Sequence, residues 1–163
     1  MITYKKIDIK ELKELYDYAT PIWKECYSEM IPSEQIELLC HKYFDYENIE
    51  KYQKDGMIYV YIYYNKERAG FIAYQVNDDH VYLDKLYLQK EYRGMHISSN
   101  AFENLMSLYN KDIVLNVNQH NERGLRAYLG KDFKIVETVT YDLGNGLYNN
   151  DYIMRKTNNF VKK

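Results

Sequence analysis

The stretch Val81–Tyr109 contains the residues whose types and spacing point most directly to chemistry. Its first part, which ends at Leu88, is rich in β-forming residues and predicts a strand. From Ile97 onward the apolar residues recur at helical spacing, and the charged segment in between contains Arg93 and Gly94. A glycine-containing turn that runs into a helix presents unpaired backbone N–H groups and the positive end of the helix dipole. Such a place binds phosphate groups well.

The same pattern also fits an ordinary connection between a strand and a helix. It is not a P-loop, because no Gly-Lys-Ser/Thr follows, and it lacks the three glycines of a dinucleotide fingerprint. Further along the chain, Asn121 is a candidate N-cap and Tyr128 lies in the helix that would follow it. By residue type alone, Tyr128 is best explained as a packing residue. No cluster of His, Cys and carboxylate residues has metal-ligand spacing, so we expect no metal site.

Composition and charge are typical of a globular protein. The 163 residues are enough for one domain with a sizeable core, so we predict a single domain over residues 1–163. The net charge of −2 gives no reason to expect a nucleic-acid partner. Cys26 and Cys40 have no metal or redox spacing and are interpreted as reduced thiols. The first twelve residues carry charges instead of an apolar core, and the longest apolar run, Met57–Tyr64, is too short to span a bilayer. We therefore expect no signal peptide, no membrane partner and a cytoplasmic location.

The first part of the chain is expected to contain one strand and three helices. They are a strand over Ile2–Ile9, a helix from Lys10 to about Ala19, a helix over Ile22–Met30, and a helix that has Ser33 as its N-cap. Pro21 separates the first two helices in this prediction, because proline is common in the first turn of a new helix.

The rest of the chain is expected to be mostly strands. They are Met57–Tyr64, Ala69–Val76, Val81–Leu88, Ile113–Val117, Phe133–Leu143 and Tyr152–Arg155, with helices at Ile97–Tyr109 and Glu122–Leu129. The order is helices, an antiparallel meander, a crossover helix and then more strands. This order predicts an α+β fold with a mixed, mostly antiparallel central sheet of about seven strands and helices on both faces.

Four segments resemble the GNAT N-acetyltransferase superfamily, whose members move an acetyl group from acetyl-CoA to an amine. Leu86–Ser98 (LYLQKEYRGMHIS) is similar to the family's signature strand and pyrophosphate loop. Leu115–Phe133 is similar to the second family segment, in which a strand leads to an Asn and then to a helical Tyr. Tyr141–Lys156 and Ile22–Ile36 resemble the closing hairpin and the substrate-side helices of a bacterial subgroup of small GNAT proteins. Together the segments span nearly the whole chain.

The resemblance implies a cytoplasmic N-acetyltransferase with the GNAT-like acyl-CoA N-acyltransferase fold, which takes acetyl-CoA as its acetyl donor. The implied cofactor-binding residues are Leu86, Tyr87, Leu88, Arg93, Gly94, Met95, His96, Ile97, Ser98, Ser99 and Asn121. Backbone N–H groups of the strand end would polarise the thioester carbonyl, and those of Gly94 to Ser99 would bind the pyrophosphate. Asn121 would hydrogen-bond the pantetheine arm, cap its helix, or do both. Tyr128 would be the general acid that protonates the departing thiolate.

The implied partners are acetyl-CoA and an amine acceptor, which is a primary amine of a small molecule or of a protein. Whether the protein forms a homodimer stays open. The general base is not identified, and the candidates are Asp84, Glu25, Glu29, Asp151 and a chain of water molecules.

The chain departs from the family pattern at several positions. His96 and Ser98 stand where the family generally has glycine or alanine. Asp132 replaces the usual glycine before a phenylalanine, and Gly130 is the alternative helix cap. If residue 96 requires a positive φ, a histidine there is strained. These departures favour a second hypothesis, in which the protein is a binding or regulatory module that holds CoA weakly or not at all, whereas Asn121 and Tyr128 favour an active enzyme.

Overall fold

The computed structural model describes residues 1–158 and contains seven strands and five α-helices in that range. The strands are β1 (Ile2–Lys6), β2 (Ile58–Tyr64), β3 (Glu67–Val76), β4 (His80–Leu88), β5 (Asp112–Asn118), β6 (Lys134–Gly144) and β7 (Leu147–Lys156). The helices are α1 (Leu12–Tyr27), α2 (Ser33–Phe44), α3 (Tyr46–Lys54), α4 (Ile97–Tyr109) and α5 (Glu122–Leu129), with short 3₁₀ helices η1 (Ile9–Glu11) and η2 (Lys90–Tyr92). None of the helices in the described range is long and apolar enough to cross a membrane.

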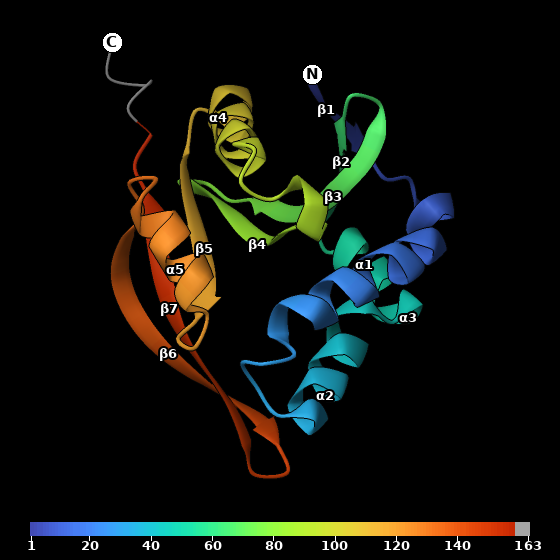
Figure 1. The fold of residues 1–163 in the computed structure, drawn as a ribbon, viewed down its shortest axis with the longest axis vertical. Coiled ribbons are helices and arrows are strands. Elements are labelled where there is room, and N and C mark those ends of the chain that lie inside the picture. Colours follow the sequence, from blue (N-terminus) through green and yellow to red (C-terminus); the bar gives the residue numbers. More distant parts are fainter. Residues whose placement is uncertain (159–163) are drawn as a thin grey trace. The chain divides into compact units, whose positions relative to one another are not determined.

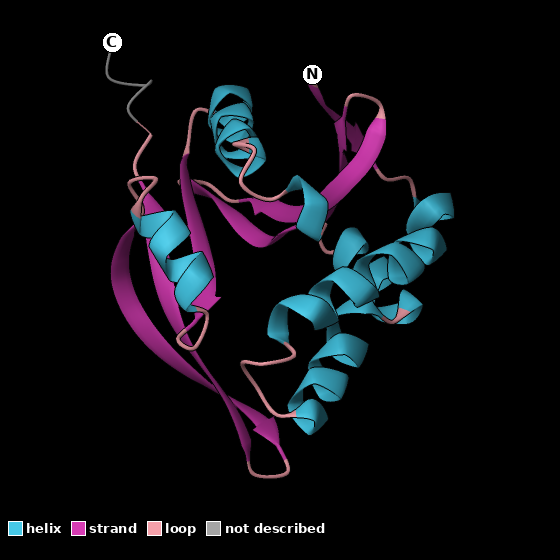
Figure 2. Ribbon diagram, viewed as in Figure 1, coloured by secondary structure: helices cyan, strands magenta, loops and turns pink. Residues whose placement is uncertain are grey.

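The strands form one mixed sheet in the order β1-β2-β3-β4-β5-β7-β6, which can be followed in Figures 1 and 2. β4 and β5 run parallel, whereas β1–β2, β2–β3, β5–β7 and β6–β7 pair antiparallel. A parallel pair needs a crossover connection, and α4 lies in the chain between these two strands. The predicted α+β class with a mostly antiparallel sheet of about seven strands is therefore confirmed.

The chain divides into two compact units, and each is described by itself. Unit 1 comprises Met1–Gln75 and Lys85–Ser98, and unit 2 comprises Val76–Asp84 and the chain from Ser99 onward. β4 contributes its first half to unit 2 and its last half to unit 1. The single domain expected over residues 1–163 extends past the described residues and stays a prediction.

Aromatic side chains form the core of unit 1. Trp23 of α1 is 2% exposed, and its ring centroid lies 6.1 Å from that of Phe44 in α2. The Phe44 ring lies 5.9 Å from Phe71 of β3 and meets it edge to face. The Tyr18 ring of α1 lies 5.6 Å from Tyr61 of β2. These edge-to-face contacts are the favoured geometry for aromatic pairs and join the helices to the strands.

α1 runs without a break through Pro21, so the prediction of two separate helices was wrong. The buried apolar residues keep one helical phase on both sides of the proline: Leu12, Leu15, Ala19, Ile22 and Trp23. Burial of Ile22 and Trp23 is worth about 2 kcal/mol each, which exceeds the cost of about 3 kcal/mol for a proline inside a helix. The hydroxyl of Thr20 also donates to the carbonyl of Tyr16 at 2.9 Å in the turn before the proline.

Other differences from the prediction lie at element boundaries. β1 ends at Lys6, before the expected end of the first strand. Ser33 is the first residue of α2 and Pro32 is its N-cap, so the expected cap was wrong by one residue. α3 was not predicted, because Ile49 is the one residue that it buries and its apolar stripe is correspondingly faint. β7 begins at Leu147, five residues earlier than expected. The prediction missed the first half of this strand because its residues are mostly polar.

The predicted bounds of α4 and α5 agree with the structure, and so does the N-cap of α5. Asn121 occupies that N-cap, and its Oδ1 accepts a hydrogen bond from the backbone N–H of Gly124 at 2.9 Å. Side chains of this type satisfy one of the unpaired donors at the start of a helix. The strongest local signals, a clear apolar stripe and a capping residue, therefore gave the most accurate boundaries.

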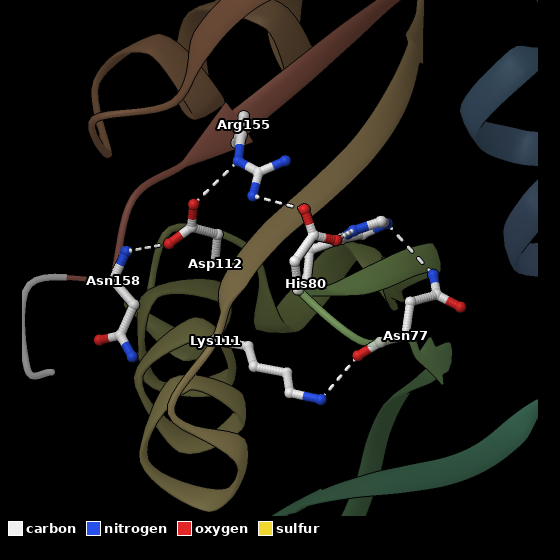
Figure 3. A network of polar contacts seen from close by, with 7 residues as sticks. Asn77, His80, Lys111, Asp112, Arg155 and Asn158 are labelled. Carbon is white, nitrogen blue, oxygen red and sulfur yellow. Dashed lines mark hydrogen bonds and ion pairs between the residues drawn. The ribbon is translucent and has the colours of Figure 1, made fainter.

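A network of polar contacts in unit 2 joins the starts of β4 and β5 to the end of β7 (Figure 3). Arg155 Nε donates to Asp112 Oδ2 at 2.8 Å, and Arg155 Nη2 lies 3.7 Å from Asp79 Oδ2. The hydrogen bond from His80 lowers the pKa of the Asp79 carboxyl. Asp112 also accepts from the backbone N–H of Asn158 at 2.7 Å. Because the three strands are tied at one end, their register is fixed along the rest of their length.

At Gly70, the backbone of β3 lies close to Tyr87 and Leu88 at the end of β4. A Cβ added at Gly70 would fall well inside the van der Waals contact distance of the Tyr87 carbonyl oxygen and 2.8 Å from Leu88 Cδ2. Two residues beyond Tyr87, the backbone N–H of Gln89 donates to the Ala69 carbonyl at 2.9 Å. The nearest atom, the Tyr87 carbonyl oxygen, belongs to the backbone and cannot move aside as a side chain can, so a side chain at position 70 would push the two strands apart.

We predict that Gly70→Ala lowers the free energy of unfolding by about 1–3 kcal/mol, the usual cost of overpacking. Urea denaturation measures the change. Gly130→Ala is the matched control, because Gly130 has a φ of −68° and a Cβ there would meet nothing closer than 3.3 Å. An unchanged free energy for Gly70→Ala would show that β4 can move away from β3 without cost.

Candidate functional site

The first part of the candidate site is the end of β4. The parallel register with β5 covers His80 to Leu83, and Leu86, Tyr87 and Leu88 lie beyond it. The Tyr87 hydroxyl lies 2.8 Å from the hydroxyl of Tyr27 in α1, and the Tyr87 ring packs 5.8 Å from Phe71. The strand end is therefore held by β3 and by the C-terminal turn of α1, all within unit 1.

Arg93 attaches the following loop to the end of β4 and to α1. Its Nε donates to the Leu88 carbonyl at 3.2 Å. Its Nη1 lies 2.9 Å from Glu25 Oε1, and its Nη2 donates to Cys26 Sγ at 3.2 Å. In unit 1 the guanidinium forms an ion pair with Glu25 and orients the loop, and the role of Arg93 in binding the cofactor stays a prediction. Glu25, a candidate general base, is thus held in an ion pair.

The loop between η2 and α4 has two residues in the left-handed region. Gly94 has a φ of +77° and His96 has a φ of +60°, so the strain considered for a histidine at this position is present. Gly94, Met95 and His96 are exposed, whereas Ile97 is 1% exposed and anchors the start of α4. The first N–H groups of a helix have no partner inside it. The loop therefore leads into the start of α4, and the binding of the pyrophosphate there stays a prediction.

The second segment of the site lies in unit 2, around the N-cap of α5. A Cβ added at Gly124 would lie 2.5 Å from Asn121 Nδ2 and 2.8 Å from its Cγ. Glycine at position 124 therefore leaves the space in which the Asn121 side chain folds back to cap the helix. Of the two roles weighed for Asn121, the structure shows the capping role, and the pantetheine contact stays a prediction.

Tyr128 projects from α5 into an aromatic group. Its ring is half-buried and lies 6.0 Å from Phe102 of α4 and 5.5 Å from Phe133. Packing holds the ring in place, which is also the condition for a positioned acid. The role of Tyr128 as general acid stays a prediction.

The cap after α5 is the glycine that the sequence offered as the alternative. Gly130 is the C-cap residue, but its φ of −68° is right-handed. The left-handed residue is Asp132, with a φ of +71°. Aspartate tolerates this region better than most residues, because its short polar side chain can hydrogen-bond locally. Asp132 thus has a backbone conformation that favours glycine.

The remaining candidate bases have different surroundings. Asp84 is half-buried on β4, and Glu29 is exposed after α1. Asp151 of β7 is 7% exposed and accepts hydrogen bonds from Asn149 Nδ2 at 3.0 Å and Asn116 Nδ2 at 3.2 Å. Burial raises the pKa of the Asp151 carboxyl, although the two amides act in the opposite direction. Asp151 is therefore the candidate whose surroundings favour taking up a proton.

A polar row in unit 2 surrounds Asp151, and most of it was missed from the sequence. It consists of Tyr82, Asn116, Asn118, Tyr141, Asn149 and Asp151, which come from four neighbouring strands. The sequence feature that could have revealed this row is the alternation of polar residues at positions 116 and 118, and at 149 and 151, since alternate residues of a strand share one face. In the described part of the chain, no group of three His, Cys, Asp or Glu side chains could hold a metal ion.

The predicted site residues divide between the two units. The structure brings together Leu86, Tyr87, Leu88 and the loop from Arg93 to Ser98 in unit 1. Ser99, Asn121 and Tyr128 belong to unit 2. Ser98 and Ser99 are consecutive half-buried residues of the first turn of α4, which links the two units along the chain.

Comparison with known proteins identifies the family. Residues 13–131 match the model of the acetyltransferase (GNAT) family. The chain belongs to this family. The resemblance seen in the sequence is therefore confirmed. No curated protein matches the sequence.

Solved structures of other GNAT proteins have the same fold. PaiA N-acetyltransferase from Thermoplasma acidophilum, in complex with coenzyme A, is 23% identical with a TM-score of 0.76, and the match covers 96% of this chain and 99% of that one. The ribosomal-protein-S18-alanine N-acetyltransferase of Escherichia coli is 15% identical with a TM-score of 0.69 and coverages of 97% and 94%. The spermidine N-acetyltransferase of Vibrio cholerae, in complex with CoA and spermine, is 12% identical with a TM-score of 0.68 and coverages of 96% and 95%. At these identities the likeness shows the GNAT fold.

We predict that His96→Gly raises the free energy of unfolding by about 1 kcal/mol, because glycine adopts a positive φ without strain. Affinity for acetyl-CoA should stay equal or increase, which isothermal titration calorimetry measures. Asp132→Gly is the matched control: it relieves the same kind of backbone strain outside the loop and should change stability alone. A large loss of acetyl-CoA affinity in His96→Gly would mean that the imidazole itself contacts the donor.

Proposed function

We propose that this protein is a cytoplasmic, acetyl-CoA-dependent N-acetyltransferase that acts on a primary amine of a small molecule or a protein. The match to the family model over residues 13–131 carries this proposal. The exposed loop with left-handed Gly94 and His96 supports it, because that loop leads into the start of α4. Similar structures whose partners are coenzyme A, spermine or a CoA–peptide bisubstrate analogue give further support.

The donor would be held mainly by backbone groups. In this proposal the N–H groups of Gly94 to Ser99, including those of Met95 and Ile97, bind the pyrophosphate at the start of α4. The strand end Leu86–Leu88 directs N–H groups toward the thioester carbonyl and stabilises the negative charge that develops on its oxygen. Arg93 orients the loop through Leu88 and Glu25. Asn121 supports the pantetheine arm from the start of α5.

The reaction is a direct attack of the amine on the thioester. The amine nitrogen forms a bond to the carbonyl carbon, and the bond from that carbon to sulfur breaks. Tyr128 donates its hydroxyl proton to the departing thiolate, and the proton that the nitrogen loses restores the phenol. A phenol with a pKa of about 10 protonates a thiolate whose thiol has a pKa of about 8.5 only when the two are held close.

A binding or regulatory module is the second candidate, and His96 is the observation that favours it. The left-handed φ of +60° at this non-glycine residue lies inside the loop that would hold the pyrophosphate. A loop strained in this way can cost donor affinity. Donor binding and turnover distinguish the two candidates.

We predict that acetyl-CoA raises the melting temperature, because a ligand that binds the folded state selectively stabilises it. At a concentration of about 100 Kd the gain is about 2.7 kcal/mol, which corresponds to a shift of about 5–10 °C for a chain of this size. Differential scanning fluorimetry measures the shift. Pantetheine, which lacks the pyrophosphate, is the control ligand and should shift the temperature much less. An unchanged melting temperature at millimolar acetyl-CoA would exclude the hypothesis that the protein is an acetyl-CoA-dependent enzyme.

We predict that Tyr128→Phe lowers turnover by about 100-fold or more, the usual scale for a positioned acid. The ring and its contacts with Phe102 and Phe133 remain, so acetyl-CoA affinity and the melting temperature should hardly change. Release of free thiol in the presence of a panel of polyamines, amino sugars and peptides measures turnover. Tyr52→Phe is the control, since that hydroxyl donates to the Lys42 carbonyl in unit 1. Normal turnover of Tyr128→Phe would make Tyr128 a packing residue.

A further inference from the structure

Asp151 is a buried carboxylate that meets amides but no cation. It is 7% exposed and accepts hydrogen bonds from the side-chain amides of Asn149 and Asn116. Among the described residues 1–158, no Lys, Arg or His forms an ion pair with it. Aspartate is almost never buried in this way unless it is paired, because the desolvated charge is costly.

The neighbours of Asp151 are locked in one orientation. The Tyr82 hydroxyl donates to Asn116 Oδ1 at 2.7 Å, which turns Asn116 Nδ2 toward Asp151 Oδ2. In the same way, Asn118 Nδ2 donates to Asn149 Oδ1 at 2.8 Å, which turns Asn149 Nδ2 toward Asp151 Oδ1. An ionised carboxylate has about four acceptor sites, and these bonds use two of them. The Asp151 carboxylate can therefore accept further hydrogen bonds.

One side of the polar row reaches the surface. Tyr141 of β6 is 41% exposed, and its hydroxyl oxygen accepts from Asn116 Nδ2 at 2.8 Å. Asn116 itself is half-buried. The hydrogen bonds that link the exposed Tyr141 to the Asp151 carboxylate therefore run through neutral groups. A cation with several N–H donors that binds here would supply a positive charge to balance the Asp151 carboxylate.

We propose that Asp151, together with Asn116 and Tyr141, forms the binding site for the ammonium group of the acceptor. A primary ammonium has three N–H donors on a compact charge, and the open sites on Asp151 and the Tyr141 oxygen are acceptors for them. This inference rests on the proposed function, because it assigns the acceptor of that reaction to a place in unit 2.

The same group would also start the reaction. The bound ammonium gives one proton to the Asp151 carboxylate and becomes a neutral amine, whose lone pair then forms the bond to the acetyl carbon of acetyl-CoA. The carbon–sulfur bond breaks and its electron pair goes to the sulfur, which takes a proton from Tyr128. The nitrogen then loses its second proton, which restores the Tyr128 phenol, and Asp151 releases the first proton to solvent. Burial raises the pKa of Asp151, which makes its carboxylate a better proton acceptor than an exposed one.

Calorimetric titration with spermidine tests the site on the wild-type protein and on two variants. Asp151→Asn should weaken spermidine binding by about 10-fold or more, because it removes the charge from a charge-assisted hydrogen bond. Glu137→Gln is the matched control, since it removes an exposed carboxylate from β6 on the same hairpin and should change affinity less than about twofold. Trialanine and N-acetyltrialanine form a second pair of probes, in which a peptide acceptor binds through its free α-amine and the acetylated peptide does not bind.

The pH dependence of spermidine binding provides a test that needs no variant. The groups that face Asp151 from β4, β5 and β6 are Tyr82, Asn116, Asn118 and Tyr141, and none of them changes charge between about pH 5 and 8. Affinity should therefore be full above the raised pKa of Asp151 and decline as the pH falls through it. A flat profile would overturn the inference.

A separate titration with acetyl-CoA distinguishes this inference from the proposed function. If acetyl-CoA does not bind, the proposed function fails, and with it the catalytic part of the inference. If acetyl-CoA binds and Asp151→Asn binds spermidine as the wild type does, the ammonium site alone is refuted. A lower melting temperature for Asp151→Asn with unchanged spermidine affinity would give Asp151 a purely structural role and would also refute the site.

Discussion

The close approach of β4 to β3 at Gly70 is the constraint on which the candidate site in unit 1 depends. Because no side chain stands at Gly70, the Tyr87 carbonyl and Leu88 can lie directly against the β3 backbone. That position lets Arg93 reach the Leu88 carbonyl and Glu25 together, which in turn sets the course of the loop through Gly94 and His96. A side chain at position 70 would therefore displace the loop, and with it the backbone N–H groups that are proposed to bind acetyl-CoA.

In unit 2 the comparable constraint is electrostatic. Strand register places Asn116 and Asn118 beside the polar half of β7, and the Arg155–Asp112 pair holds that register at the far end. Hydrogen bonds from Tyr82 and Asn118 then decide which end of each amide faces Asp151. The result is a carboxylate surrounded by oriented dipoles, an arrangement that keeps the charge tolerable in the interior and available to a cation.

Sequence reasoning succeeded where one local signal was sufficient. The apolar stripe of α4 and the Asn121 cap of α5 gave exact bounds, because periodicity and capping are properties of consecutive residues. It failed at Pro21, where burial on both sides of the proline outweighs a local break signal, and at the polar first half of β7, whose partner strand supplies the pairing. The polar row could not be found this way, since four strands must align before its side chains meet.

The side chains of residues 121 and 124 compete for the same space, so only one of the two positions can carry a side chain that fills it. While the asparagine folds back over the first turn of α5, residue 124 has no room for a methyl group. A shorter capping residue such as serine would release that restriction, and alanine would then become acceptable three residues later. Homologous sequences should therefore exchange these two residues together, and a mutational library that varies position 121 with glycine fixed at 124 misses the combinations in which residue 124 carries a side chain.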